Sequence, residues 1–170
     1  MRKKLLMFIV ALAPLFATAQ NLKIAHLNAQ EIFSAMPELS GIETQLTNKQ
    51  EQINKNGQAL IDEFNKKAEE FEAASATASD TQKQDQQKQL QSIQERYQLF
   101  LQNSQQEMSQ LQQQLLEPVN KKISDAIQAI GEAEGYTYIF DISTMQSPIV
   151  YVDKANSVDI TQSVKTKLGI

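Results

Sequence analysis

The 170-residue sequence has no cysteine and no tryptophan, and it contains one histidine, five glycines and four prolines. Without cysteine the chain makes no disulfide and offers no thiolate ligands. The single His26, without clustered carboxylates, is a poor basis for a metal site or a catalytic triad. No glycine-rich phosphate loop is present. We therefore expect no enzyme, no catalytic or metal-binding residue and no cofactor.

The N-terminal residues have the pattern of a secretory signal peptide. A basic start at residues 2–4 precedes an apolar run at 5–12, and Ala17-Thr18-Ala19 gives the small-x-small cleavage site. The alternative is a retained anchor, but the apolar run is shorter than the roughly 20 residues that cross a bilayer. We expect residues 1–19 to be removed after Ala19 and the protein to reside in the periplasm.

The charge of the mature chain is strongly acidic. The full sequence has 16 basic and 20 acidic residues, and removal of Arg2, Lys3 and Lys4 leaves 13 basic against 20 acidic. A protein of this charge repels nucleic acid and anionic lipid. No later apolar run is long enough to span a bilayer, so we expect no stable membrane insertion and no nucleic-acid partner.

The middle of the sequence predicts a helical hairpin. Polar helix-forming residues dominate, and apolar residues recur at heptad spacing in two separate seams. The first contains Leu46, Ile53, Leu60, Gly57, Phe64 and Phe71, and the second contains Leu90, Ile93, Tyr97, Phe100, Ser104 and Leu111. Residues 72–89 lack large apolar side chains, so we place a turn near 73–80, with Asp80 as a helix cap. One continuous helix is the alternative, because that segment lacks glycine and proline.

Both ends of the mature chain predict a small mixed body. Strands are expected at 22–28, 136–142 and 149–152, and short helices at 30–35 and 160–168. Gly135 is suited to end the second long helix. Asp159 is suited to cap the start of the last helix. The fold class is therefore α+β, mainly α. A body at 20–40 and 118–170 carries a long antiparallel hairpin arm at 41–117.

A body of this size buries too little apolar surface to offset the conformational entropy of folding comfortably, so we expect it to form an oligomer. Its aromatic and β-branched strand residues would meet neighbouring subunits. The candidate contact residues are Ile24, Leu27, Tyr136, Tyr138, Phe140, Ile149 and Tyr151.

The arm carries more apolar residues than one seam accepts. Leu99, Phe100 and Leu101 are consecutive and span about 200° of helix circumference, so they cannot all face the partner helix. The surplus side chains either pack against other arms or bends of the hairpin, or line a surface that holds unfolded polypeptides. Candidates for contact with such clients are Ile61, Phe64, Phe71, Leu99, Phe100, Leu101 and Leu116.

The order of these segments resembles the Skp/OmpH family of periplasmic chaperones along the whole mature chain. Two motifs precede the hairpin, Ile24-Ala25-His26-Leu27-Asn28 and Gln30-Glu31-Ile32-Phe33. Two follow it, Gly135-Tyr136-Thr137-Tyr138-Ile139-Phe140-Asp141 and Val158-Asp159-Ile160-Thr161. The resemblance implies a homotrimer whose arms hold unfolded outer-membrane proteins without ATP. Pro118 would then be a hinge between arm and body, since proline kinks a helix.

The charge of the arm departs from the family pattern of basic arms. Residues 41–117 carry 12 acidic and 7 basic side chains, so we do not carry over a lipopolysaccharide partner. A different function is a structural or adaptor protein whose arms bind one folded partner in the envelope. Such an adaptor would bind one protein tightly, whereas a chaperone would hold several unrelated unfolded barrels.

Overall fold

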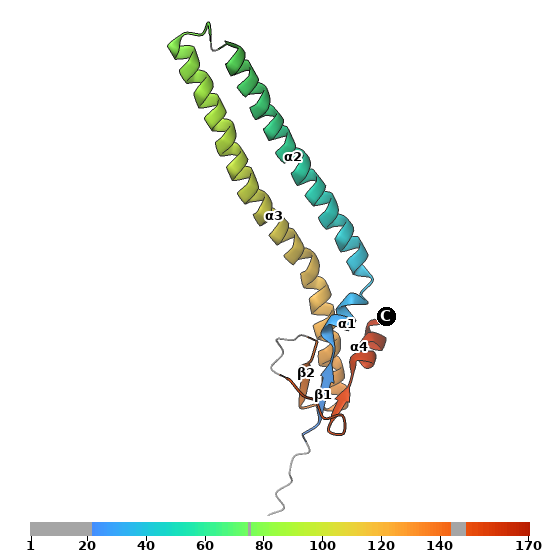
Figure 1. Cartoon of the computed structure of the whole chain (residues 1–170). Coiled ribbons are helices and arrows are strands. Elements are labelled where there is room, and N and C mark those ends of the chain that lie inside the picture. Colours follow the sequence, from blue (N-terminus) through green and yellow to red (C-terminus); the bar gives the residue numbers. More distant parts are fainter. Residues whose placement is uncertain (1–21, 75, 144–148) are drawn as a thin grey trace, which may run out of the picture.

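The computed structural model describes residues 22–143 except 75, and residues 149–170. Two long helices form an arm that rises from a small body (Figure 1): α2 is Glu38–Ala74 and α3 is Asp80–Glu134. The predicted mainly helical α+β class and its hairpin are confirmed. The predicted signal peptide at 1–19 lies outside the described residues.

The two helices of the arm pack along the predicted seams. Ile93 and Ser104 of α3 are buried, and so is Gly57 of α2. The ring of Phe100 lies over Gly57 so closely that a Cβ added there would be 3.1 Å from its Cε1. A glycine in the seam thus makes room for a large ring from the opposite helix.

The hairpin turns between Ala74 and Asp80, so one continuous helix through this segment is wrong. The predicted cap at Asp80 is also wrong, because Ser79 caps α3. Its hydroxyl accepts a hydrogen bond from Gln82 N at 3.3 Å, while Ser79 N donates to Gln82 Oε1 at 2.9 Å. This reciprocal pair is a capping box, and it places Asp80 in the first turn of the helix, where its charge favours the helix dipole.

A three-stranded parallel sheet lies in the body. The central strand β1 (Ile24–Leu27) pairs with β2 (Tyr138–Asp141) on one side and β3 (Ser157–Asp159) on the other. The entire arm is therefore the connection between β1 and β2. The predicted strand at 149–152 is wrong. Residues 149–152 are assigned to no strand, and both neighbours of β1 in the sheet come from other segments.

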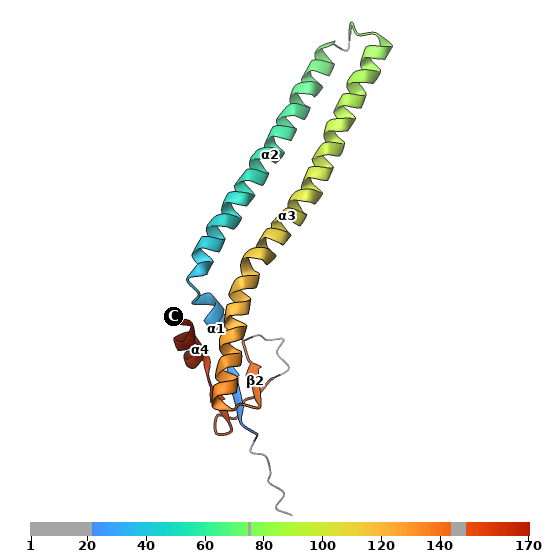
Figure 2. The ribbon, with the colours of Figure 1, turned by 180° about the vertical axis from the view of Figure 1, so that it is seen from behind.

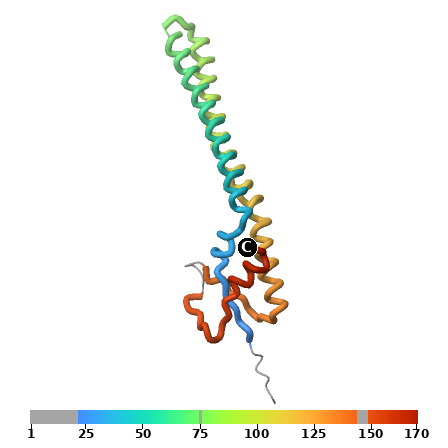
Figure 3. Tube along the Cα trace, turned by 90° about the vertical axis from the view of Figure 1, so that its right-hand side faces the viewer, coloured from blue at the N-terminus to red at the C-terminus, as the bar shows by residue number. Residues whose placement is uncertain are grey.

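Two short helices and the lower part of α3 lie beside the sheet (Figures 2 and 3). These helices are α1 (Ala29–Ser34) and α4 (Thr161–Leu168). The core residues are Ala25, Leu27, Ile32, Met36, Ile42, Val119, Ile123, Ala126, Ile130, Ile160 and Val164. Helix α3 supplies four of these core residues, so it belongs to both the body and the arm. Its packing in the core holds the base of the arm in place.

Helix α3 continues through Pro118 without a break in its assignment. Figure 1 shows its axis changing direction where the colour passes from yellow to orange, between the arm and the part packed on the sheet. Proline removes one backbone donor and crowds the preceding turn, which accounts for a bend in this region.

Candidate functional site

A groove of about 830 Å³ lies between α2 and α3, partway along the arm. Leu60, Ile61 and Phe64 line it from α2. The residues from α3 are Gln91, Ile93, Gln94, Glu95, Tyr97, Gln98 and Leu99. We call these ten residues the arm groove. The groove is lined by apolar side chains together with polar ones, most of which are glutamines. Binding clefts commonly combine apolar and polar side chains in this way.

Several apolar side chains of the arm groove face solvent. Leu99 is 58% exposed and Ile61 is 37% exposed, whereas Ile93, in the same groove, is buried in the seam at 5%. Phe64 is half-buried. The exposed parts of these two side chains are not used by the packing of the hairpin, so they are available to another polypeptide.

A second groove of about 470 Å³ shares Leu60 and Leu99 with the arm groove. Two ion pairs join the helices here. Arg96 donates two hydrogen bonds to Glu63, at 3.0 and 3.2 Å, and Lys49 Nζ lies 2.6 Å from Glu107 Oε2. These pairs are solvent-exposed and contribute little stability, but they fix which residues face each other across the hairpin.

The candidate client contacts occupy different environments. Ile61, Phe64 and Leu99 come together in the arm groove. Phe100 instead packs over Gly57 in the seam, and half-buried Phe71 lies near the end of α2. Leu101 is 44% exposed but does not line the arm groove. Leu116 packs against the core of the body. The sequence singled out these seven together, and the fold separates them.

The glutamines of the arm groove were not among the predicted site residues. Gln91, Gln94 and Gln98 are spaced by three and four residues, so they share one face of α3. That spacing is visible in the sequence beside Leu99. It was missed because glutamine is abundant throughout the arm.

The candidate oligomer contacts also differ in exposure. Tyr138 is 54% exposed and stacks on Phe140 with 6.0 Å between ring centroids, and Tyr151 is 79% exposed. Leu27, by contrast, is 2% exposed and belongs to the core of its own subunit, so it has no surface to offer a neighbour. Ile24, Tyr136 and Ile149 are half-buried. The sequence missed Val150, 98% exposed, and Val158, 50% exposed.

His26 lies beside a serine and an aspartate. Its Nδ1 is 2.8 Å from Ser157 Oγ, and its Nε2 is 4.0 Å from Asp159 Oδ2. The second distance is too long for a hydrogen bond. None of these three residues lines any of the grooves identified among the described residues. The contact links neighbouring strands β1 and β3 and does not present a nucleophile to a substrate.

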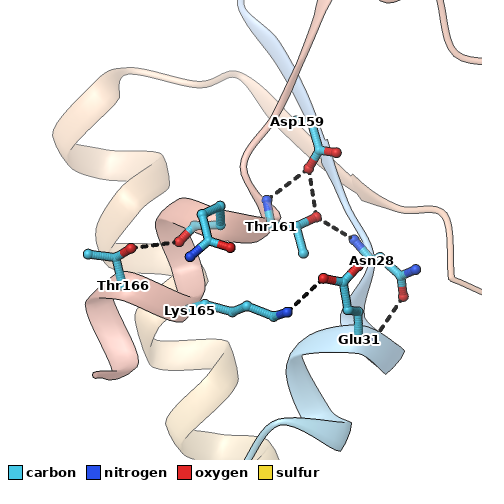
Figure 4. Close-up of polar contacts among 7 residues, drawn as sticks. Asn28, Glu31, Asp159, Thr161, Lys165 and Thr166 are labelled. Atoms are coloured by element: carbon cyan, nitrogen blue, oxygen red, sulfur yellow. Dashed lines mark hydrogen bonds and ion pairs between the residues drawn. The ribbon is translucent and has the colours of Figure 1, made fainter. Parts of the chain in front are cut away.

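A polar network fastens α4 to the rest of the body (Figure 4). Asp159 Oδ1 accepts hydrogen bonds from Thr161 Oγ1 at 2.6 Å and from Thr161 N at 2.9 Å. Thr161 Oγ1 in turn accepts from Asn28 N, and Lys165 Nζ lies 2.6 Å from Glu31 Oε1. The Thr161 hydroxyl holds the pKa of Asp159 below its usual value. The N-cap of α4 is Ile160, so the cap predicted at Asp159 is displaced by one residue, although the Asp159 carboxylate does accept from the first backbone N–H of the helix.

The part of the protein that the structure describes contains no cluster of three or more His, Asp or Glu side chains suited to a metal ion. Among the same residues, no helix combines the length and the apolar character that a bilayer crossing requires.

The described residues thus form a long helical hairpin, with a groove between its helices, that projects from a small mixed α+β body. A profile of the OmpH-like outer membrane proteins matches residues 23–168. The chain belongs to this family, and the resemblance drawn from its sequence is confirmed.

A crystal structure shows the same fold in a protein described as an OmpH-like outer membrane chaperone, from Caulobacter crescentus CB15. The TM-score is 0.69 at 18% identity, and the alignment covers 85% of this chain and 82% of the other. No curated protein matches this sequence.

Proposed function

We propose that this protein is an ATP-independent holding chaperone of the periplasm that binds unfolded outer-membrane proteins between its helical arms. The arm groove carries the proposal, because it exposes Ile61 and Leu99 on a hairpin whose own seam is already filled. Exposed apolar groups of this kind bind the apolar segments of an unfolded protein weakly, which permits release without nucleotide hydrolysis. Membership of the OmpH-like family supports the same function.

A homotrimer is part of the proposal. Val150, Tyr151 and Tyr138 expose apolar surface on the small body of one subunit, and burying them against other copies would lower its free energy. Three bodies joined in this way would carry three arms around a shared space. The bend in α3 near Pro118 would set how far the arms spread, so we keep Pro118 as the hinge.

The direct test is suppression of aggregation. An unfolded outer-membrane β-barrel protein is diluted from urea into buffer with the mature protein, and light scattering is followed. We expect the native protein to keep the barrel protein in solution, and the variant Ile61→Ser/Leu99→Ser to lose most of this activity while keeping its helicity. Leu22→Ser is the control, because it removes a leucine that is 52% exposed on the body, away from the groove.

Two results would contradict the proposal. If the native protein fails to hold several unrelated unfolded barrels but binds one folded envelope protein tightly, it is an adaptor. If the double variant holds clients as well as the native protein does, the arm groove is not the binding surface.

A further inference from the structure

We propose that the arm groove selects extended polypeptide segments in which apolar and polar residues alternate, and that Gln94 and Gln98 bind the backbone of these segments. This inference rests on the proposed function and specifies what part of an unfolded client the groove recognises. It assigns a role to the glutamines, which a purely apolar holding surface does not need.

The apolar side of the groove fits every second side chain of an extended segment. Ile61 and Phe64 approach from α2, and Leu99 approaches from α3 on the other side. In an extended segment successive side chains point to opposite faces, so one face alone can be apolar. The apolar face would contact these three residues, and the polar face would stay in water.

The glutamines match the repeat of such a segment. Gln94 and Gln98 are four residues apart, so their backbones are separated by about 6 Å along the helix axis. Two residues of an extended segment advance by about 6.6 Å. The amide of each glutamine has donors and an acceptor, so it can pair with a backbone carbonyl and a backbone N–H. Neither of these two side chains forms a hydrogen bond to another described residue, whereas the Gln91 amide donates to Glu95 Oε1 at 3.0 Å.

The length of the groove also fits a short segment. Gln91 to Leu99 spans eight residue steps of α3, which is about 12 Å at 1.5 Å per residue. An extended segment of about four residues has the same length. Glu95 is the one charged residue among those lining the groove, so anionic segments are disfavoured and neutral or cationic ones fit.

A helix from a second copy fits this surface less well. A third helix packed along the arm needs an apolar stripe repeated over several heptads. Around the groove the exposed large apolar residues of α2 and α3 are Ile61, Leu99 and Leu101, which are confined to one level of the arm. The remaining exposed positions are polar or small residues such as Ala59, so a short extended segment is the occupant that the surface favours.

The test uses three labelled peptides with the full mature protein. The first alternates valine and threonine over eight residues, with a lysine at each end. The second has the same composition with its valines in one block, and the third is the alternating peptide with N-methyl groups on two central amides. We expect fluorescence anisotropy to show binding of the first and at least fivefold weaker binding of the other two. The second peptide places threonine as well as valine on each face of the extended segment, and the third loses backbone hydrogen bonds that contribute about 1 kcal/mol each.

The variant Gln94→Ala/Gln98→Ala tests the role of the glutamines. Alanine is a better helix former than glutamine, so the arm stays folded. We expect affinity for the alternating peptide to fall about tenfold, consistent with the loss of two hydrogen bonds. Gln106→Ala/Gln110→Ala is the matched control, with the same spacing on α3 outside the groove, and should bind as the native protein does.

The outcomes separate this inference from the proposed function. If the three peptides bind equally, or the glutamine variant is unaffected, the inference is wrong even though unfolded barrel proteins are still held. If neither the peptides nor the barrel proteins are bound, the proposed function itself fails.

Discussion

The packing of Phe100 over Gly57 predicts a specific energetic coupling between α2 and α3. Glycine inside a helix is less favourable than alanine by about 0.8–1.0 kcal/mol. The gain from Gly57→Ala is opposed, however, because the new methyl group would lie 3.1 Å from Phe100 Cε1 and displace the ring. In the native background we therefore expect Gly57→Ala to raise the free energy of unfolding by less than half of this gain.

Removing the ring should release the full gain. Phe100→Ala alone should lower the free energy of unfolding by about 2 kcal/mol, less than for a fully buried phenylalanine because this side chain is half-buried. In that background Gly57→Ala should stabilise the protein by about 1 kcal/mol. The difference between the two backgrounds, about 0.5 kcal/mol or more, measures the contact between the helices.

The assay is urea unfolding followed by circular dichroism, at one protein concentration because an oligomer's stability depends on it. Gly41→Ala is the control, since a Cβ there meets nothing within 4 Å, and it should have the same effect in both backgrounds. Equal effects of Gly57→Ala in the two backgrounds would refute the reasoning, because they would mean that Phe100 does not lie over Gly57.

Three further predictions concern the turn, the hinge and the body. Ser79→Ala should lower the free energy of unfolding by about 1 kcal/mol through loss of the capping box, and Ser79→Asp, which keeps an acceptor, should lower it less; equal losses in urea unfolding would exclude the cap. Pro118→Ala should straighten α3 and narrow the range of distances between spin labels on the arm and the body; an unchanged distribution would show that no hinge is needed. The pKa of Asp159 is lowered in the folded protein by the Thr161 hydroxyl, so its stabilising effect should be present above the ordinary value of 3.8 and be lost as pH falls below it. In Asp159→Asn the free energy of unfolding should therefore fall less steeply as the pH is lowered. An unchanged pH dependence would show that the Asp159 carboxylate does not cause this loss of stability.

The arm could be predicted from the sequence because its information is local. Residues such as Leu46, Ile53 and Leu60 repeat at heptad spacing, and the loss of apolar side chains after Phe71 marks the turn. The cap was misplaced by one residue because both Ser79 and Asp80 are good caps. Only the reciprocal bond with Gln82 distinguishes them.

The body was harder to predict because its pairing is non-local. Residues 149–152 have strong strand propensity but run outside the sheet, whereas the polar segment Ser157–Asp159 pairs with β1. Strand propensity describes a half-buried pleated surface and does not choose the partner. The choice instead follows from contacts between residues far apart in the sequence, such as His26 with Ser157.

Site-specific photo-crosslinking on the native arm tests most directly where a client binds. A photoreactive amino acid is placed at position 91 in the arm groove, or at position 106 on the same helix outside it, and an unfolded barrel protein is added before illumination. The account predicts a strong crosslink from position 91 and a weak one from 106. Equal crosslinking from both positions, or crosslinking from 106 alone, would contradict it.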